Sequence, residues 1–171
     1  MSKKIPYISL SAIAFLVIID QIVKKWIIAN VKDKPSKEFI HFGDFRVIDL
    51  TYVGNDGVIF GTFGGARMVI TIVTAVCIVA AFYYLVKFGK MSKWISSSLT
   101  LILSGGIGNF IDRFLHNGVV IDYLEVKLFD FAVFNFADCM IVFGSIMLII
   151  YMFFFEKSES VDKQNLNETK K

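Results

Sequence analysis

Long apolar runs and polar connections alternate along the chain. Each apolar run has about the length that a helix needs, at about 1.5 Å per residue, to cross a hydrocarbon core of about 30 Å. After the last run, residues 157–171 are polar and lack apolar periodicity, which predicts a disordered cytoplasmic tail. The pattern therefore predicts one transmembrane domain over residues 1–156, with helices at 5–29, 68–86, 94–110 and 137–155.

The first polar connection, residues 31–67, contains a segment with strand-like patterning. Residues 39–53 alternate loosely between apolar and polar positions, and Gly43-Asp44 within them favours a turn. A small extended hairpin fits this pattern better than a helix does. The predicted fold class is an all-α integral membrane protein with four transmembrane helices and a small extracytoplasmic β-hairpin or cradle.

Basic residues indicate which side is cytoplasmic. The chain starts with a basic segment, Met1 to Lys4, and the short connection after the second run holds Lys87, Lys90 and Lys93. Such dense positive charge is typical of cytoplasmic loops, so both termini are predicted to be cytoplasmic. The first run is not followed by a small-x-small cleavage site, and we expect a retained helix rather than a cleaved signal peptide.

Composition agrees with the membrane class. Hydrophobic residues make up 56% of the 171 residues, which exceeds the average of soluble proteins. The net charge of +3 is small and scattered, so we expect no nucleic-acid partner. Cys77 and Cys139 would lie at different depths and have no closely spaced Cys or His neighbours, which predicts neither a disulfide nor a metal site.

Polar residues gather where the third apolar run ends. Asn109, Asp112, Arg113 and His116 are spaced i, i+3, i+4 and i+7, which places them on one stripe of a helix. Local chemistry alone favours an Asp/Arg network that ties helix ends together as the role of Asp112. For His116 it favours a solvated position.

Two further groups have a simple structural interpretation. Asp20 and Lys24 are spaced i, i+4 near the outer end of the first run, where a self-neutralised interfacial ion pair is favoured over a functional one. Asn55 and Gly57 stand in a stretch where a surface turn is favoured. Its glycines would also let the backbone approach a substrate closely.

Two carboxylates are harder to explain as structural. Asn135 can cap the fourth run with Asp138 three residues later, but apolar residues follow Asp138 and leave its carboxylate at the edge of hydrocarbon. Asp122 lies in a β-favouring run, and turn signals occur only before it. The two could meet at one depth and share a proton, so that one activates a water and the other donates to the substrate. That is the chemistry of an aspartic peptidase.

Other functions are compatible with polar residues inside a membrane. From the residues alone, a small transporter or proton-conducting protein stands level with an enzyme, but it should show repeated halves or interrupted helices, and neither is visible. A structural membrane subunit would leave the carboxylates without a role. The sequence contains no serine nucleophile elbow, no His-Glu metal motif and no phosphate-binding glycine loop.

Five short motifs follow one another along the chain. They are Asp20-Gln21-x-x-Lys24, Asn55-x-Gly57-x-x-Phe60, Gly108-Asn109-x-Ile111-Asp112-Arg113, Gly118-x-Val120-Ile121-Asp122-Tyr123 and Phe134-Asn135-x-Ala137-Asp138. In this order they resemble the motifs of the bacterial lipoprotein signal peptidase family, also called signal peptidase II. The resemblance covers nearly the whole chain apart from the tail. Val58 and Ile59 depart from it, because two alanines are usual there.

The resemblance implies an activity and its site residues. It implies an aspartic endopeptidase of the cytoplasmic (inner) membrane, which removes the signal peptide from a prolipoprotein just before a diacylglyceryl-modified cysteine at the outer face. The partners would be this prolipoprotein and membrane lipid, and we expect a monomer without cofactor or metal. By position, Asp122 and Asp138 are the implied catalytic pair, and the implied substrate-binding or supporting residues are Asp20, Lys24, Asn55, Gly57, Asn109, Asp112, Arg113 and Asn135.

Overall fold

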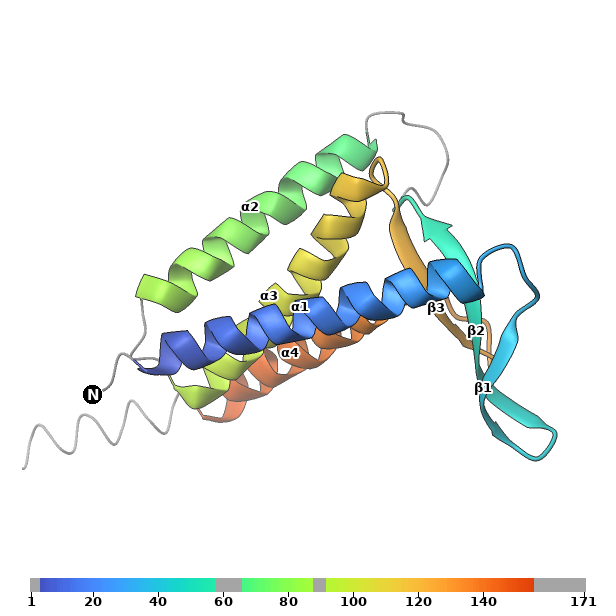
Figure 1. Ribbon diagram of the computed structural model, residues 1–171. Coiled ribbons are helices and arrows are strands. Elements are labelled where there is room, and N and C mark those ends of the chain that lie inside the picture. The colour runs from blue at the N-terminus through green and yellow to red at the C-terminus, as the bar shows by residue number, and fades with distance from the viewer. Residues whose placement is uncertain (1–3, 58–65, 88–91, 156–171) are drawn as a thin grey trace, which may run out of the picture.

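The computed structural model describes residues 4–57, 66–87 and 92–155. Figure 1 shows helices running from one end of the molecule to a small sheet at the other. The predicted hairpin and the four predicted helices are confirmed as secondary structure, whereas the predicted tail lies outside the described residues. The helices are α1 (Lys4–Asn30), α2 (Ala66–Lys87), α3 (Lys93–Leu115) and α4 (Phe136–Phe154), and the strands are β1 (Lys37–Phe42), β2 (Phe45–Asn55) and β3 (Val120–Val126).

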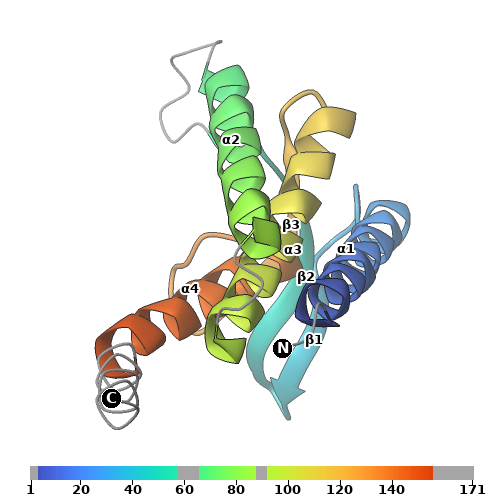
Figure 2. The same ribbon diagram turned by 90° about the vertical axis from the view of Figure 1, so that its left-hand side faces the viewer.

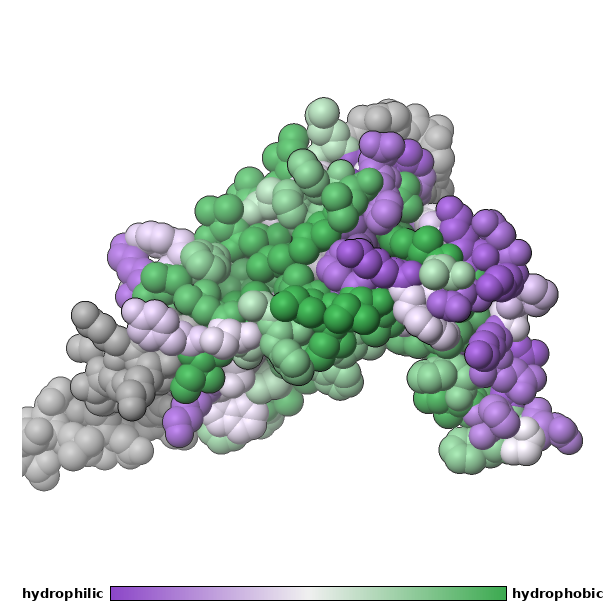
Figure 3. All heavy atoms as spheres, viewed as in Figure 1, coloured by the Kyte–Doolittle hydropathy of each residue, from purple (hydrophilic) through white to green (hydrophobic). Residues whose placement is uncertain are grey.

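Among the described residues, three helices are long and apolar enough to cross a membrane: Arg67–Lys87, Lys93–Leu115 and Phe136–Phe154. The apolar window of α2 is only 6% buried inside the protein, so this helix presents nearly all its side chains outward. Figure 3 shows apolar side chains over the helices and polar ones over the outer side of the sheet. Lipid, rather than water, is the solvent that suits such a helical surface. That α1 is a fourth span stays a prediction.

The central helix is α3, which packs against α1, α2 and α4. Figure 2 shows α1 and α4 on its two sides. A Cβ atom added at Gly105 would lie 2.2 Å from the carbonyl oxygen of Ala137, and one at Gly144 would lie 2.8 Å from that of Ser98. The close packing of α3 on α4 therefore requires these glycines.

The sheet has three antiparallel strands in the order β1-β2-β3. Gly43, with a φ of 60°, forms the turn of the predicted β1-β2 hairpin. Asn117 and Gly118 also have positive φ, at 53° and 90°, in the turn that leads from α3 into β3. The pairing of β3 with β2, which sets Asp122 opposite Val53, was not predicted because the two strands lie far apart in the sequence.

An apolar cluster fixes the sheet to the end of α1. Ile27 and Val31 at this end pack with Leu50 of β2 and with Ile121 and Tyr123 of β3. Successive side chains of a strand point to opposite faces, so this packing turns the intervening residue of β3, Asp122, away from the cluster.

Candidate active site

Polar side chains from five elements meet where the sheet joins the helices. Most of them are almost completely enclosed, with exposed fractions between 0% and 6%. Buried polar groups of this kind are stable only with hydrogen-bond partners. The buried members are Asp20 and Lys24 of α1, Asn109 and Asp112 of α3, Asp122 of β3, and Asn135 before α4.

Asp122, which is 1% exposed, accepts two amide hydrogen bonds. The Nδ2 of Asn55 donates to its Oδ2 at 2.7 Å, and the Nδ2 of Asn135 donates to its Oδ1 at 2.6 Å. Burial raises the pKa of Asp122 to about 6, and the negative charge of Asp138 adds to this shift, while both amide bonds oppose it. This carboxyl therefore holds its proton to a higher pH than an ordinary aspartate does.

Asp138 is half-buried in the first turn of α4 and takes part in a capping box. The Oδ1 of Asn135 accepts from the backbone N–H of Asp138, and Asp138 Oδ2 accepts from the backbone N–H of Asn135, both at 3.0 Å. The predicted cap is confirmed and accounts for one oxygen of Asp138. The other oxygen, Oδ1, accepts from Asn109 Nδ2 of α3 at 2.8 Å.

Asn109 and Asn135 join the two carboxylates. The Nδ2 of Asn135 donates to Asp122 and also, at 3.1 Å, to Asn109 Oδ1. An amide has one donor end and one acceptor end, so these bonds turn the Nδ2 of Asn109 toward Asp138. A continuous chain of hydrogen bonds thus runs from Asp122 through two amides to Asp138.

Asn55 and Gly57 form the open edge of the site. The backbone N–H of Gly57 donates to Asn55 Oδ1 at 2.8 Å, which leaves Asn55 Nδ2 to bind Asp122. Gly57 has a φ of 70°, a conformation that favours glycine. The predicted turn is confirmed, and it also orients a side chain of the site. Val58, Ile59 and Phe60 of this motif lie outside the described residues.

Lys24 lies at the centre of a buried ion cluster. Its Nζ is 2.9 Å from Asp20 Oδ2, 2.7 Å from Asp112 Oδ2, and 3.1 Å from Asn109 Oδ1, to which it donates. The predicted ion pair between Asp20 and Lys24 is confirmed, but the prediction that it reaches out toward the membrane surface is wrong, because both side chains are enclosed between α1 and α3. An i, i+4 spacing shows that two residues share a helix face but does not show what that face packs against.

Asp112 also differs from its prediction. Its ion-pair partner within the described residues is Lys24 of α1 rather than an arginine. Asp112 Oδ2 further accepts from the backbone N–H of Ile121 at 3.2 Å, so the ion cluster holds the start of β3 in place. Arg113 is half-buried and donates to the backbone carbonyl of Asn109 at 3.4 Å. His116, as predicted, is exposed and lies outside the cluster.

Sequence reasoning missed the contributions of Gln21 and Gly108. Gln21 Nε2 donates to Asp112 Oδ1 at 3.1 Å and to the carbonyl oxygen of Gly108 at 3.2 Å. A Cβ atom at Gly108 would lie 2.5 Å from Asp20 Oδ2, so glycine is needed for α1 to approach α3 here. Both residues stand in the motifs quoted above, but no role in the site was predicted for either of them.

The described residues hold no group of three or more His, Cys, Asp or Glu side chains that could bind a metal ion. Cys77 and Cys139 are free thiols.

A family model described as "Signal peptidase (SPase) II" matches residues 12–154. This chain belongs to the signal peptidase II family. Members from three bacteria, each named lipoprotein signal peptidase, are similar to it. The protein of Streptococcus thermophilus is 40% identical over 82% of this chain and 89% of its own length. The proteins of Streptococcus agalactiae and Lactococcus lactis are 37% and 35% identical, over 88% and 84% of this chain and 92% and 91% of their own lengths.

Two solved structures, both described as a bacterial membrane enzyme, have the same fold. One superposes with a TM-score of 0.76 at 30% identity and covers 86% of this chain and 93% of its own. The other has a TM-score of 0.72 at 32% identity and covers 85% and 87%. This signal peptidase II family member is thus a multi-pass bacterial membrane protein and a peptidase.

Proposed function

We propose that this protein is an aspartic endopeptidase that removes the signal peptide from diacylglyceryl-modified prolipoproteins just before the lipidated cysteine. The names of its relatives support the substrate class. The observation that carries the chemistry is the hydrogen-bond chain from Asp122 through Asn135 and Asn109 to Asp138. The negative charge of Asp138 also raises the pKa of Asp122, so ionisation of one carboxyl disfavours ionisation of the other, and this coupling supports a pair that holds one proton, as an aspartic peptidase needs.

The surroundings of the two carboxyls favour a division of roles. Asp138 accepts two N–H donors near the N-terminus of α4, where the helix dipole stabilises negative charge. We assign it as the general base that takes a proton from the attacking water. Asp122, more deeply buried and with a raised pKa, carries the shared proton and donates it to the oxygen of the scissile carbonyl.

The remaining polar residues position this pair. Asn55 is exposed and Asp138 is half-buried, so the site is open on that side, where a peptide can reach it. On the opposite side, Lys24 with Asp20 and Asp112 ties α1 to α3 and orients Asn109. Gly57 orients Asn55 on the open side, and Arg113, which donates to the backbone carbonyl of Asn109, supports the opposite side.

The site also lies at one end of the membrane helices, next to the sheet. The first and last described residues lie at the opposite end (Figure 1). The 27 residues of α1 are more than the ~20 that a membrane span requires. With α1 as a fourth span, both termini face the cytoplasm, and the site lies near the outer face of the cytoplasmic membrane.

The test is a gel-shift cleavage assay in detergent micelles, with one prolipoprotein offered with and without its diacylglyceryl group. We expect cleavage of the lipidated form only, and a rate loss of about 10²- to 10⁴-fold in Asp122→Asn and in Asp138→Asn. Asp130→Asn, an exposed carboxylate outside the cluster, is the matched control and should cleave normally. Full activity in either dyad variant would refute the assignment. Proton flux in liposomes without any cleavage would favour the transporter alternative.

A further inference from the structure

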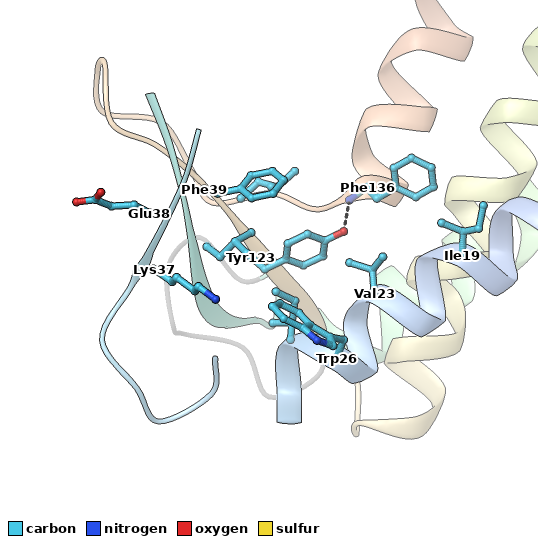
Figure 4. Close-up of a pocket in the computed structure, with 11 residues that line it drawn as sticks. Ile19, Val23, Trp26, Lys37, Glu38, Phe39, Tyr123 and Phe136 are labelled. Carbon is cyan, nitrogen blue, oxygen red and sulfur yellow. Dashed lines mark hydrogen bonds between the residues drawn. The ribbon is translucent and has the colours of Figure 1, made fainter. Parts of the chain in front are cut away.

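A cavity of about 530 Å³ lies between the outer end of α1 and the sheet. Figure 4 shows the side chains of all three strands and α1 around it. Tyr123 borders this cavity, whereas its neighbour Asp122 faces the amides of Asn55 and Asn135. Neither Asp122 nor Asp138 is among the residues that line the cavity. Its apolar lining includes Ile19, Val23, Trp26, Phe39, Tyr123 and Phe136.

The surface around this cavity is suited to lipid. Phe39, Phe42 and Phe45 of the hairpin are 56%, 73% and 61% exposed, and no described residue covers them. Trp26, 45% exposed at the cavity wall, is a residue type that concentrates at membrane–water interfaces. Figure 3 shows apolar side chains beneath the sheet, facing the hollow beside the helices, and polar ones on its outer side. An apolar underside of this kind is suited to contact with the surface of a bilayer.

At the rim of the cavity, a positively charged group faces inward and a negatively charged group faces outward. Lys37 and Glu38 both border the cavity, but Figure 4 shows the ammonium group of Lys37 turned toward it and the carboxylate of Glu38 turned away. Glu38 instead lies 3.6 Å from Arg46. Lys37 has no ion-pair or hydrogen-bond partner within the described part of the chain. An apolar cavity with one unpaired cation at its mouth is complementary to an acyl chain that carries an anionic headgroup.

We propose that this cavity binds a phospholipid of the surrounding bilayer, with one acyl chain among Val23, Phe39 and Phe136 and an anionic headgroup on Lys37. The lipid of the prolipoprotein is not the proposed occupant, because neither Asp122 nor Asp138 lines the cavity. The bound lipid would anchor the hairpin to the membrane next to the site. The proposal does not depend on the peptidase assignment.

The test uses phosphatidylglycerol with a photoactivatable group at the end of one acyl chain. It is added to the purified protein in detergent micelles, and the labelled peptides are mapped by mass spectrometry. We expect the label on the peptides that line the cavity, from the outer half of α1 and from β1. Lys37→Gln should lower this labelling about fivefold, the effect of one lysine near an anionic headgroup. Lys34→Gln makes the same charge change in the same connection but does not border the cavity, and should leave labelling unchanged.

A second lipid probe and a cavity-filling variant complete the test. A phosphatidylcholine probe should label the cavity weakly and equally in the wild type and in Lys37→Gln. Val23→Trp, which fills the cavity, should abolish labelling by both lipids. The proposal is overturned if the label spreads evenly over α2 and α3 or if Lys37→Gln matches Lys34→Gln. It is also overturned if lipidated prolipoprotein displaces the probe, since the cavity would then belong to the substrate.

Discussion

The two sides of β3 have opposite kinds of interior. On one side, Asp122 is held by amides whose donor and acceptor ends are fixed by other bonds. On the other, Ile121 and Tyr123 pack with apolar side chains of α1 and β2 beside a cavity. Apolar contacts are non-directional, whereas buried polar groups need partners in defined places. The polar side should therefore tolerate far fewer substitutions than the apolar side.

The largest loss of folding stability is expected at the ion cluster that joins the polar side of β3 to α1. Lys24→Met would leave Asp20 and Asp112 as buried carboxylates without their cation, at a loss of about 3–5 kcal/mol of folding stability. Lys25→Met removes the same charge from an exposed neighbouring position and should change stability by less than about 0.5 kcal/mol. Unfolding of both variants in mixed detergent micelles measures the difference. Equal stability would show that the cluster is not a structural unit.

A smaller loss is expected from a single methyl group on the polar side. Gly108→Ala would place a Cβ atom 2.5 Å from Asp20 Oδ2 and push this carboxylate away from Lys24, at about 1–3 kcal/mol. Gly106→Ala is the matched control, because its Cβ atom would meet Ile78 at an ordinary 3.4 Å. Thermal unfolding should separate the two variants. A destabilised Gly106→Ala with an unaffected Gly108→Ala would contradict the packing described.

The next effect concerns the pH dependence of cleavage. Asn55 donates to the ionised form of Asp122 and so lowers its pKa from where burial alone would put it. Because Asp122 must be protonated to donate, the cleavage rate should fall as the pH rises through about 6. Asn55→Ala should raise the pKa of Asp122 further, so this limb of the pH–rate profile should move to higher pH by about one unit. Steady-state cleavage across pH 4 to 9 is the measurement.

Histidine titrates in the same range, so the control removes both histidines of the chain. The variant His41→Gln/His116→Gln should keep the limb near pH 6, because neither side chain contacts the site. A limb that disappears with the histidines, or that stays in place in Asn55→Ala, would show that Asp122 is not the titrating group.

The smallest effect is expected on the apolar side. Tyr123→Phe keeps the shape of the ring and removes only the hydroxyl, which accepts from the backbone N–H of Phe136 at 3.2 Å. We expect a loss of about 0.5–1.5 kcal/mol. Tyr52→Phe, in a partly exposed position on β2, should be close to neutral. If Tyr123→Phe destabilised the protein as much as Lys24→Met, the contrast between the two sides of β3 would fail.

The sequence alone predicted the elements well, because each has a strong local signal. Apolar runs of membrane-spanning length marked the helices, and Gly43-Asp44 marked a turn that the structure contains. Asn135 and Asp138 were identified as a cap from their spacing, and the structure contains this capping box. The third strand was visible as a β-favouring run, but its partner was not, since pairing with β2 depends on contacts between distant segments.

Burial and partners could not be predicted in the same way. Asp20 and Lys24 looked like an interfacial ion pair, and only the packing of α1 on α3 encloses them. Asp112 has a neighbouring arginine in the sequence, yet it pairs with Lys24 from another helix. Local spacing identifies which side chains share a face, whereas tertiary packing decides what each face meets.

The central claim is that Asp122 and Asp138 act as one proton-sharing unit, and a double variant tests it most directly. Cleavage rates of the lipidated prolipoprotein would be measured for Asp122→Asn, Asp138→Asn and the protein carrying both changes. Residues that act as a unit show non-additive losses, so we expect the double variant to keep about the same residual rate as either single variant. Losses that multiply in the double variant would show that the two carboxylates act independently, and would contradict the shared-proton dyad.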